Sequence, residues 1–356
     1  MNGLFDGFRQ TESFAGRQVW FAGANTENGF IGSYPAIADE GGLKRLYIIK
    51  GGSGTGKSTM MLRLGEAAEE AGHRAEYFLC GSDPESLDAV RLDGKIVMLD
   101  GTAPHVADMR YPGAASSLAD LSRFWDPELL EARREEIAAH AALKQAEYAS
   151  AYRLLGAAGL LLREEAALSE GRFLREKAEG YAARLVKKLG RPDPAGEAGE
   201  YFTHGITMRG RRSVPTLGAG AGIRYVLEDR DGCAWQMLPV LAAALRRAGW
   251  KITVGRFPLC GLLTGIRAGD FSFTVGRAGE GEVPIRMTRF VDPAARRGRL
   301  RLTERLREAC LAEADTRLAA AAEHHFALEE IYRPAMDFSA KEAYEKKLIG
   351  EILGRL

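Results

Sequence analysis

Apolar and polar positions alternate in short blocks over the first 125 residues, and these blocks predict strands and helices in turn. The apolar runs Leu46–Ile49, Ala75–Leu79 and Ile96–Leu99 each predict a buried strand. From residue 57 to residue 71 the apolar positions recur at the spacing of one helix face, and Gly72 is a suitable stop. Strands that alternate with helices are typical of an α/β fold, with mostly parallel sheets flanked by helices.

The pattern changes after Trp125. Asp126 is a good N-cap, and Pro127 suits the first position of a helix. The charged, alanine-rich segment that follows, broken near Gly156 and Gly159, predicts a long helical hairpin over about 126–189. Residues 191–200, rich in proline and glycine at their start, predict a linker between one domain at 1–190 and another at 201–356.

The second half of the chain resembles a degenerate repeat of the first. Chance similarity among α/β segments is the alternative explanation, but the matching segments occur in the same order, and one pair shares Arg-Phe-x-Asp-Pro. We therefore favour a duplication. The matches are Trp20–Gly23 with Tyr201–His204, Tyr47–Ile49 with Tyr225–Leu227, Ala71–His73 with Ala248–Trp250, and Ser122–Pro127 with Thr288–Pro293.

A glycine-rich run between the first strand and its helix has the spacing of the Walker A motif, G-x-x-x-x-G-K-[ST]. Glycines let the backbone turn tightly, so that its N–H groups and the helix N-terminus point at phosphate oxygens. The lysine of this motif contacts the β- and γ-phosphates, and the next hydroxyl coordinates Mg²⁺. We expect a nucleotide to bind at Gly51, Gly52, Ser53, Gly54, Thr55, Gly56, Lys57, Ser58 and Thr59, with Lys57 also catalytic and Ser58 a metal ligand.

Asp100 closes the third strand, where a Walker B aspartate would hold Mg²⁺ through water. A simple Asp-Gly turn is the alternative interpretation. Many ATP-hydrolysing motors carry a glutamate at the next position to polarise water, and this chain has Gly101 there. Hydrolysis is then slow, or another residue activates water, or the acceptor is not water. Thr102 and His105, which leave the same strand end, are candidates for sensing the γ-phosphate or positioning water, with a capped loop as the alternative.

Asp83 follows the second strand at the same edge of the sheet. It could orient a phosphoryl acceptor as a base, as in small-molecule kinases. The alternative, which we favour, is a helix cap, because Ser82 and Glu85 have the spacing of a capping box and Pro84 suits a first helical position.

The second copy lacks these phosphate-binding residues. Trp235 stands at the position of Lys57, and Gln236 at that of Ser58. Like charges about 4 Å apart repel by several kcal/mol at the effective dielectric of a protein surface, and carboxylates stand where phosphates would lie. We therefore expect no nucleoside triphosphate to bind there in the P-loop manner. These carboxylates are Glu228, Asp229 and Asp231.

Charge and composition narrow the choice of partner. The 49 Lys and Arg nearly balance the 48 Asp and Glu, for a net charge of +1, which argues against a nucleic-acid footprint over the whole surface. The arginine run at 286–301 lacks interleaved aromatics, which also disfavours nucleic acid. No apolar run reaches the length of a membrane span, and the start of the chain does not have the pattern of a secretory signal. The four cysteines are far apart, so a cytoplasmic location is the simplest expectation.

The chain resembles a poorly characterised bacterial family of tandem P-loop proteins, described as ATPases or as nucleotide-kinase-like. The resemblance implies a P-loop NTPase fold in each half and nucleotide binding by residues 51–59. Members of the family can carry a second P-loop, and this chain departs from that pattern. The matching motifs, besides the Walker A run, are Phe21–Phe30, Cys80–Asp88, Leu99–His105 and Tyr111–Ala114.

Together these features predict a duplicated P-loop NTPase fold with long helical hairpins and one site for Mg²⁺ and ATP, or GTP, in the N-terminal half. The first hypothesis is a slow ATPase that acts as a nucleotide-dependent switch. The second is a small-molecule or nucleotide kinase with Asp83 at the acceptor. The third is a nucleotide-binding scaffold that does not hydrolyse its ligand. The further partner, a protein or a small-molecule acceptor, is left open.

Overall fold

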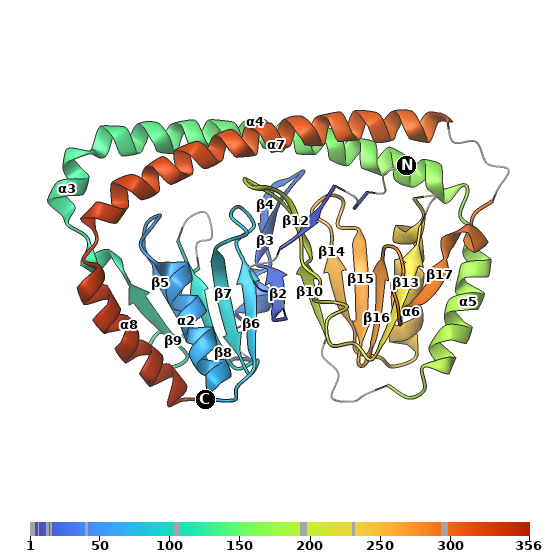
Figure 1. Ribbon diagram of the computed structural model, residues 1–356, viewed down its shortest axis with the longest axis horizontal. Coiled ribbons are helices and arrows are strands. Elements are labelled where there is room, and N and C mark those ends of the chain that lie inside the picture. The colour runs from blue at the N-terminus through green and yellow to red at the C-terminus, as the bar shows by residue number, and fades with distance from the viewer. Residues whose placement is uncertain are drawn as a thin grey trace.

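One twelve-stranded sheet runs through the molecule, and two long helices lie side by side across one edge of it (Figure 1). The computed structural model describes residues 4–5, 7–11, 14, 16–39, 42–102, 107–192, 198–229, 232–292 and 298–356. The sheet is flanked by helices, and six of its eleven strand pairs are parallel. The described residues thus form an α/β protein, as the sequence predicts.

The two halves of the sheet repeat one order of strands, outward from a central antiparallel contact between Phe21 and Phe202. Parallel and antiparallel pairs also follow each other in the same order in both halves. The N-terminal half has β2 (Gln18–Phe21), β6 (Ala75–Leu79), β7 (Leu87–Leu92), β8 (Ile96–Asp100), β5 (Arg45–Lys50) and β9 (Ser116–Asp120). The C-terminal half has β10 (Gly199–Phe202), β14 (Thr253–Arg256), β15 (Leu263–Ala268), β16 (Phe271–Val275), β13 (Ile223–Glu228) and β17 (Val283–Arg286).

A small hairpin beside the sheet is also present in both halves. The hydroxyl of Thr26 donates to Gly29 O at 2.8 Å, and that of Thr207 donates to Gly210 O at 2.6 Å, so the two turns are closed alike. The hairpins are β3 (Gly23–Thr26) with β4 (Gly29–Gly32), and β11 (His204–Thr207) with β12 (Gly210–Ser213); β1 (Arg9–Gln10) pairs with β12, and the short helix α1 (Tyr34–Ile37) follows β4.

The helices connect the two halves, because each long helix leads to a shorter helix that packs on the opposite half. The long helices α4 (Arg134–Glu170) and α7 (Gly298–Tyr332) run antiparallel over both halves (Figure 1). At the end of α4, α5 (Arg175–Lys188) packs on α6 (Ala234–Arg247) of the C-terminal half, whereas α8 (Phe338–Leu353), at the end of the chain, packs on α2 (Lys57–Glu70) of the N-terminal half. The C-terminal half of the sheet is therefore covered by α5, which follows α4, and the N-terminal half is covered by α8, which follows α7.

Matching backbone hydrogen bonds fix the correspondence between these connections. Asp126 N donates to Ala335 O at 2.7 Å, and Asp292 N donates to Arg172 O at 2.8 Å. Two residues further along, Asp337 N donates to Phe124 O, as Leu174 N does to Phe290 O. Four short elements complete the connections: the 3-10 turns η1 (Ser122–Phe124), η2 (Met287–Phe290) and η3 (Arg333–Ala335), and the helix α3 (Pro127–Ala132).

The prediction of a helical hairpin broken near Gly156 and Gly159 is wrong. Residues 134–170 form one uninterrupted helix, whose antiparallel partner is α7 rather than a second helix within 126–189. A β-carbon on Gly159 would lie 3.0 Å from that of Glu27. This glycine therefore allows the β3–β4 turn to approach α4 closely, and it does not end the helix.

Several local predictions are confirmed. The three predicted strands lie within β5, β6 and β8, and the helix predicted over 57–71 is α2. Asp126 caps α3 by accepting hydrogen bonds from the N–H groups of Glu128 and Leu129, at 3.0 and 3.2 Å. No helix among the described residues is long and apolar enough to cross a membrane.

His204 makes the fold sensitive to acid. Its ring lies 5.0 Å from the rings of Phe5 and Phe8 and 5.8 Å from that of Phe257, and this burial lowers its pKa to about 3. An unfolded histidine titrates near pH 6.5, so the unfolded chain binds more protons below that pH, and stability falls as pH falls from about 6.5 toward 3.

We expect the free energy of unfolding to be about 2 kcal/mol lower at pH 5 than at pH 7 because of this one side chain. Urea unfolding at both pH values measures the difference. The His204→Phe variant can pack with the same three phenylalanines and should lose about that much of the pH dependence. An unchanged pH dependence in the variant would contradict the assignment.

Candidate functional site

The glycine-rich loop, residues 51–56, joins the end of β5 to the start of α2. Gly54 and Gly56 have φ angles of +68° and +81°, a left-handed backbone that glycine adopts at no steric cost. Gly56 is also the residue immediately before the first turn of α2. The loop thus wraps around the N-terminus of the helix, which is the arrangement that binds anions.

Lys57 lies over the loop that precedes it. Its Nζ donates hydrogen bonds to Gly51 O at 3.1 Å and to Gly52 O at 2.7 Å, and lies 3.6 Å from Oδ2 of Asp100. The side chains of Lys57 and Asp100 are each only 12% exposed. Thr55 closes the loop from within, since its hydroxyl donates to Gly52 O at 2.9 Å.

Asp100 is brought to the loop by the register of two strands. It ends β8 and lies opposite Ile49 of β5, two residues before Gly51, where the glycine-rich loop begins. Its Oδ1 accepts a hydrogen bond from Thr102 N at 2.8 Å, and the Thr102 hydroxyl donates to Gly51 O at 2.9 Å. Thr102 therefore links the glycine-rich loop to Asp100 through these two hydrogen bonds. The candidate His105 lies outside the described residues.

Of the two hydroxyls that begin α2, only Ser58 faces the strands. Ser58 Oγ accepts a hydrogen bond from Leu87 N at 2.9 Å, whereas Thr59 is exposed. Ser58 remains able to offer a lone pair to a cation. Ser53, at the tip of the loop, is half-buried.

The prediction of a helix after Asp83 is wrong, because residues 82–86 form a turn and β7 begins at Leu87. Asp83 does cap this turn, since its Oδ1 accepts a hydrogen bond from Glu85 N at 3.1 Å. The same oxygen lies 2.7 Å from Nε of Arg209, and Nη2 of Arg209 lies 3.2 Å from Glu85. Arg209 belongs to the β11–β12 turn, so the C-terminal half supplies a cation to this edge.

The long helices bring further ionisable groups that sequence reasoning missed. The pKa of His325 falls to about 4, first because of burial and then because Lys144, Lys57 and Arg209 are nearby cations. Burial also lowers the pKa of Lys144 and raises that of Glu329. Lys144 is on α4, while His325 and Glu329 are on α7. Only the helix crossing brings them to the loop, so local sequence carries no signal for them.

The outer side of the glycine-rich loop is packed by the same region. A β-carbon on Gly52 would lie 3.1 Å from the ring of Tyr332 and 3.3 Å from that of Trp125, and one on Gly54 would lie 3.2 Å from Glu329. Close packing therefore favours glycine at both positions, and the positive φ of Gly54 favours it there as well. The end of α7 rests directly on the loop.

The corresponding edge of the C-terminal half has different chemistry. Asp229 Oδ2 accepts a hydrogen bond from Ala234 N at 2.7 Å at the start of α6, and burial raises the pKa of this carboxyl. Trp235 donates its indole N–H to Gly232 O at 2.6 Å. Gln236 of α6 is buried. The equally long helices α2 and α6 begin at Lys57 and Ala234, so Trp235 corresponds in the structure to Ser58 rather than to Lys57. Asp231 lies outside the described residues, and the absence of P-loop binding here stays a prediction.

Comparisons with family models, with curated proteins and with solved structures gave no match to this chain.

Proposed function

We propose that the N-terminal half binds Mg²⁺ and ATP, with the triphosphate held by residues 51–59, and that the protein is a slow ATPase acting as a nucleotide-dependent switch. The observation that carries the proposal is the position of Lys57. Its ammonium group lies at the junction of β5 and α2, between two loop carbonyls and Asp100. A nearly buried ammonium group at a helix N-terminus suits a phosphate chain.

The contacts of Lys57 also indicate how the ligand would be accommodated. Phosphate oxygens would replace Gly51 O and Gly52 O as acceptors for the ammonium group. Asp100, released from Lys57, would then hold Mg²⁺ through water, and Ser58 would coordinate the ion directly. No glutamate follows Asp100, which supports slow hydrolysis rather than a motor cycle.

The repeated strand order supports a duplicated P-loop unit with one functional site. The exchange of helices supports a switch. Glu329 and Tyr332 of α7 contact the loop, and Arg307 of the same helix lies in the other half, 2.8 Å from Glu165 of α4. A change at the loop that shifts α7 would therefore also move the Arg307–Glu165 contact in the C-terminal half.

The kinase hypothesis is weakened by Arg209. A carboxylate that is ion-paired at 2.7 Å is a poor base, because the arginine stabilises its charged form. Arg209 also lies close enough to Glu329, which packs on the loop, to lower the pKa of that carboxyl. We expect Asp83→Asn to leave phosphate release from ATP intact, and loss of transfer to a metabolite in this variant would favour the kinase.

Calorimetric titration with Mg²⁺ and a slowly hydrolysed ATP analogue tests the proposal. We expect one nucleotide per chain, and chelation of Mg²⁺ should weaken binding. No binding of ATP or GTP would overturn the proposed function, and two nucleotides per chain would overturn the asymmetry between the halves.

A further inference from the structure

The internal repeat relates residues of one long helix to residues of the other. The matched backbone hydrogen bonds just after the two helices place Ser169 of α4 at the position of Tyr332 of α7, because each of these residues lies three positions before the bonded carbonyl. Both helices are uninterrupted up to these positions. Lys144 of α4 therefore corresponds to Arg307 of α7, which precedes Tyr332 by as many residues as Lys144 precedes Ser169.

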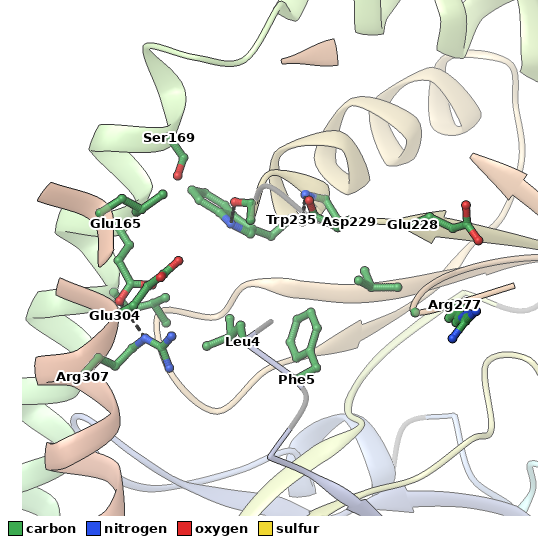
Figure 2. Close-up of a pocket in the computed structure, with 16 residues that line it drawn as sticks. Leu4, Phe5, Glu165, Ser169, Glu228, Asp229, Trp235, Arg277, Glu304 and Arg307 are labelled. Carbon is green, nitrogen blue, oxygen red and sulfur yellow. Dashed lines mark hydrogen bonds and ion pairs between the residues drawn. The ribbon is translucent and has the colours of Figure 1, made fainter. Parts of the chain in front are cut away.

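In the C-terminal half the two long helices line a cavity of about 580 Å³, opposite the end of β13 and the start of α6 (Figure 2). Arg307, Glu165 and Ser169 are among the lining residues. Arg307 donates from Nε to Oε1 of Glu165 at 2.8 Å, and the two side chains lie next to each other at one end of the cavity (Figure 2). This half therefore pairs the guanidinium group of α7 with a carboxylate of α4.

The corresponding cation of the N-terminal half lacks that carboxylate. By the same count along the helices, Leu328 stands at the position of Glu165, and Leu328 is buried. Burial lowers the pKa of Lys144, and the described group that acts in the opposite direction is the Cys80 thiol rather than a carboxylate. Among the residues that the structure describes, the half-buried ammonium group of Lys144 thus has no ion-pair partner.

His325 of α7 connects Lys144 with the glycine-rich loop. Burial lowers the pKa of His325, and the nearby cations Lys144 and Lys57 lower it further. His325 Nε2 lies 3.6 Å from Oε1 of Glu329, and the backbone of Glu329 would lie 3.3 Å from a β-carbon on Gly54 of the loop. Lys144 and Lys57 therefore approach the same space, one from α4 and the other from α2.

We propose that Lys144 binds the terminal phosphate of ATP, and that α4 distinguishes ATP from ADP through this contact. The inference rests on the proposed function, because it requires the triphosphate to lie at residues 51–59. A partly buried ammonium group without a carboxylate is unfavourable, and an anionic ligand offsets the loss of hydration. Glu165 supplies the anion for Arg307, whereas Lys144 would receive one only from the nucleotide.

The contact would couple the nucleotide to the C-terminal half. From Lys144, α4 continues to Glu165, and the chain then enters α5, which packs on α6. ADP lacks the terminal phosphate and would leave Lys144 without its anion. A triphosphate, but not a diphosphate, would therefore hold α4 close to the glycine-rich loop.

Calorimetric titration of the full chain with Mg²⁺ tests the proposal by comparing ADP with adenosine 5′-(β,γ-imido)triphosphate. Lys144→Met keeps the aliphatic chain and removes the charge. We expect it to weaken binding of the triphosphate about tenfold or more, as for the loss of one charged hydrogen bond. ADP affinity should stay within about twofold. Lys57→Ala should instead weaken the binding of both nucleotides, because this lysine also contacts the β-phosphate.

Lys144→Gln, a second neutral variant, should show the same selective loss. The matched control is Arg153→Gln, which removes an exposed cation from the same helix and should leave both affinities unchanged. Circular dichroism checks that each variant is folded. Equal losses for the two nucleotides, or no loss for the triphosphate, in folded Lys144 variants would overturn this inference and leave the N-terminal nucleotide site standing. Failure of the unmodified chain to bind either nucleotide would overturn the proposed function, and this inference with it.

Discussion

Replacing Lys57 with alanine should weaken ATP binding about 100-fold or more, as measured by calorimetry. The side chain is nearly buried, and its Nζ is already within hydrogen-bonding distance of two loop carbonyls. A charged hydrogen bond contributes about 1.5–3 kcal/mol, and about 3 kcal/mol corresponds to roughly a 100-fold change in affinity. The loop should keep its shape, because Thr55 and Thr102 hold it through their own hydrogen bonds.

Trp235→Ala is the control, because Trp235 lies in the first turn of α6, the helix of the other half that corresponds to α2. It should leave ATP affinity within about twofold of the unmodified chain. Lys57→Arg adds a second comparison: it keeps the charge, but its larger planar head does not fit between the two carbonyls, so it should not restore full affinity. Equal losses in Lys57→Ala and Trp235→Ala would contradict a single N-terminal site.

Glu345→Ala should destabilise the protein by about 3–5 kcal/mol, because it leaves the buried ammonium of Lys341 without its carboxylate. The two side chains are 5% and 1% exposed and are hydrogen-bonded to each other on α8. Lys341 Nζ would lie 3.0 Å from a β-carbon on Gly56, so the pair sits against the glycine-rich loop. Urea unfolding measures the loss.

Two further variants separate burial from charge. Lys341→Met combined with Glu345→Leu removes both charges at similar volume and should recover most of the stability. Glu342→Ala on the same helix removes an exposed pair with Lys346, 3.4 Å apart, and should cost less than about 1 kcal/mol. A loss in Glu345→Ala no larger than in Glu342→Ala would show that the buried pair contributes little.

The positions in the C-terminal half that correspond to Lys341 and Glu345 link this ion pair to the glycine-rich loop. Lys341 comes four residues after Asp337, and Ala178 comes four residues after Leu174, which makes the matching hydrogen bond. Ala178 is fully buried, as is Ala182 at the position of Glu345. The C-terminal half therefore has small apolar residues where the N-terminal half has an ion pair.

Local sequence was sufficient for the elements that local forces determine. An apolar run between turn residues can bury itself only as a strand or a helix segment, and β5, β6, β8 and α2 were predicted from such runs. The Asp126 cap needs only its own next three residues. Local rules failed at Ser82–Glu85, where the spacing of a capping box occurs in a turn before β7. There, pairing with β6 and β8 outweighed a local preference for helix.

What the sequence by itself determined is the loop between β5 and α2, the aspartate at the end of β8 and the order in which the repeated segments occur. Only the tertiary structure decided which helix covers which half. Alanine-rich helices of 37 and 35 residues carry apolar positions that suit several partners, and the pairing of α4 with α7 depends on contacts between residues more than 100 positions apart. That crossing brings His325 and Glu329 to the glycine-rich loop and opens the cavity beside Ser169. Neither result follows from any short stretch of the chain.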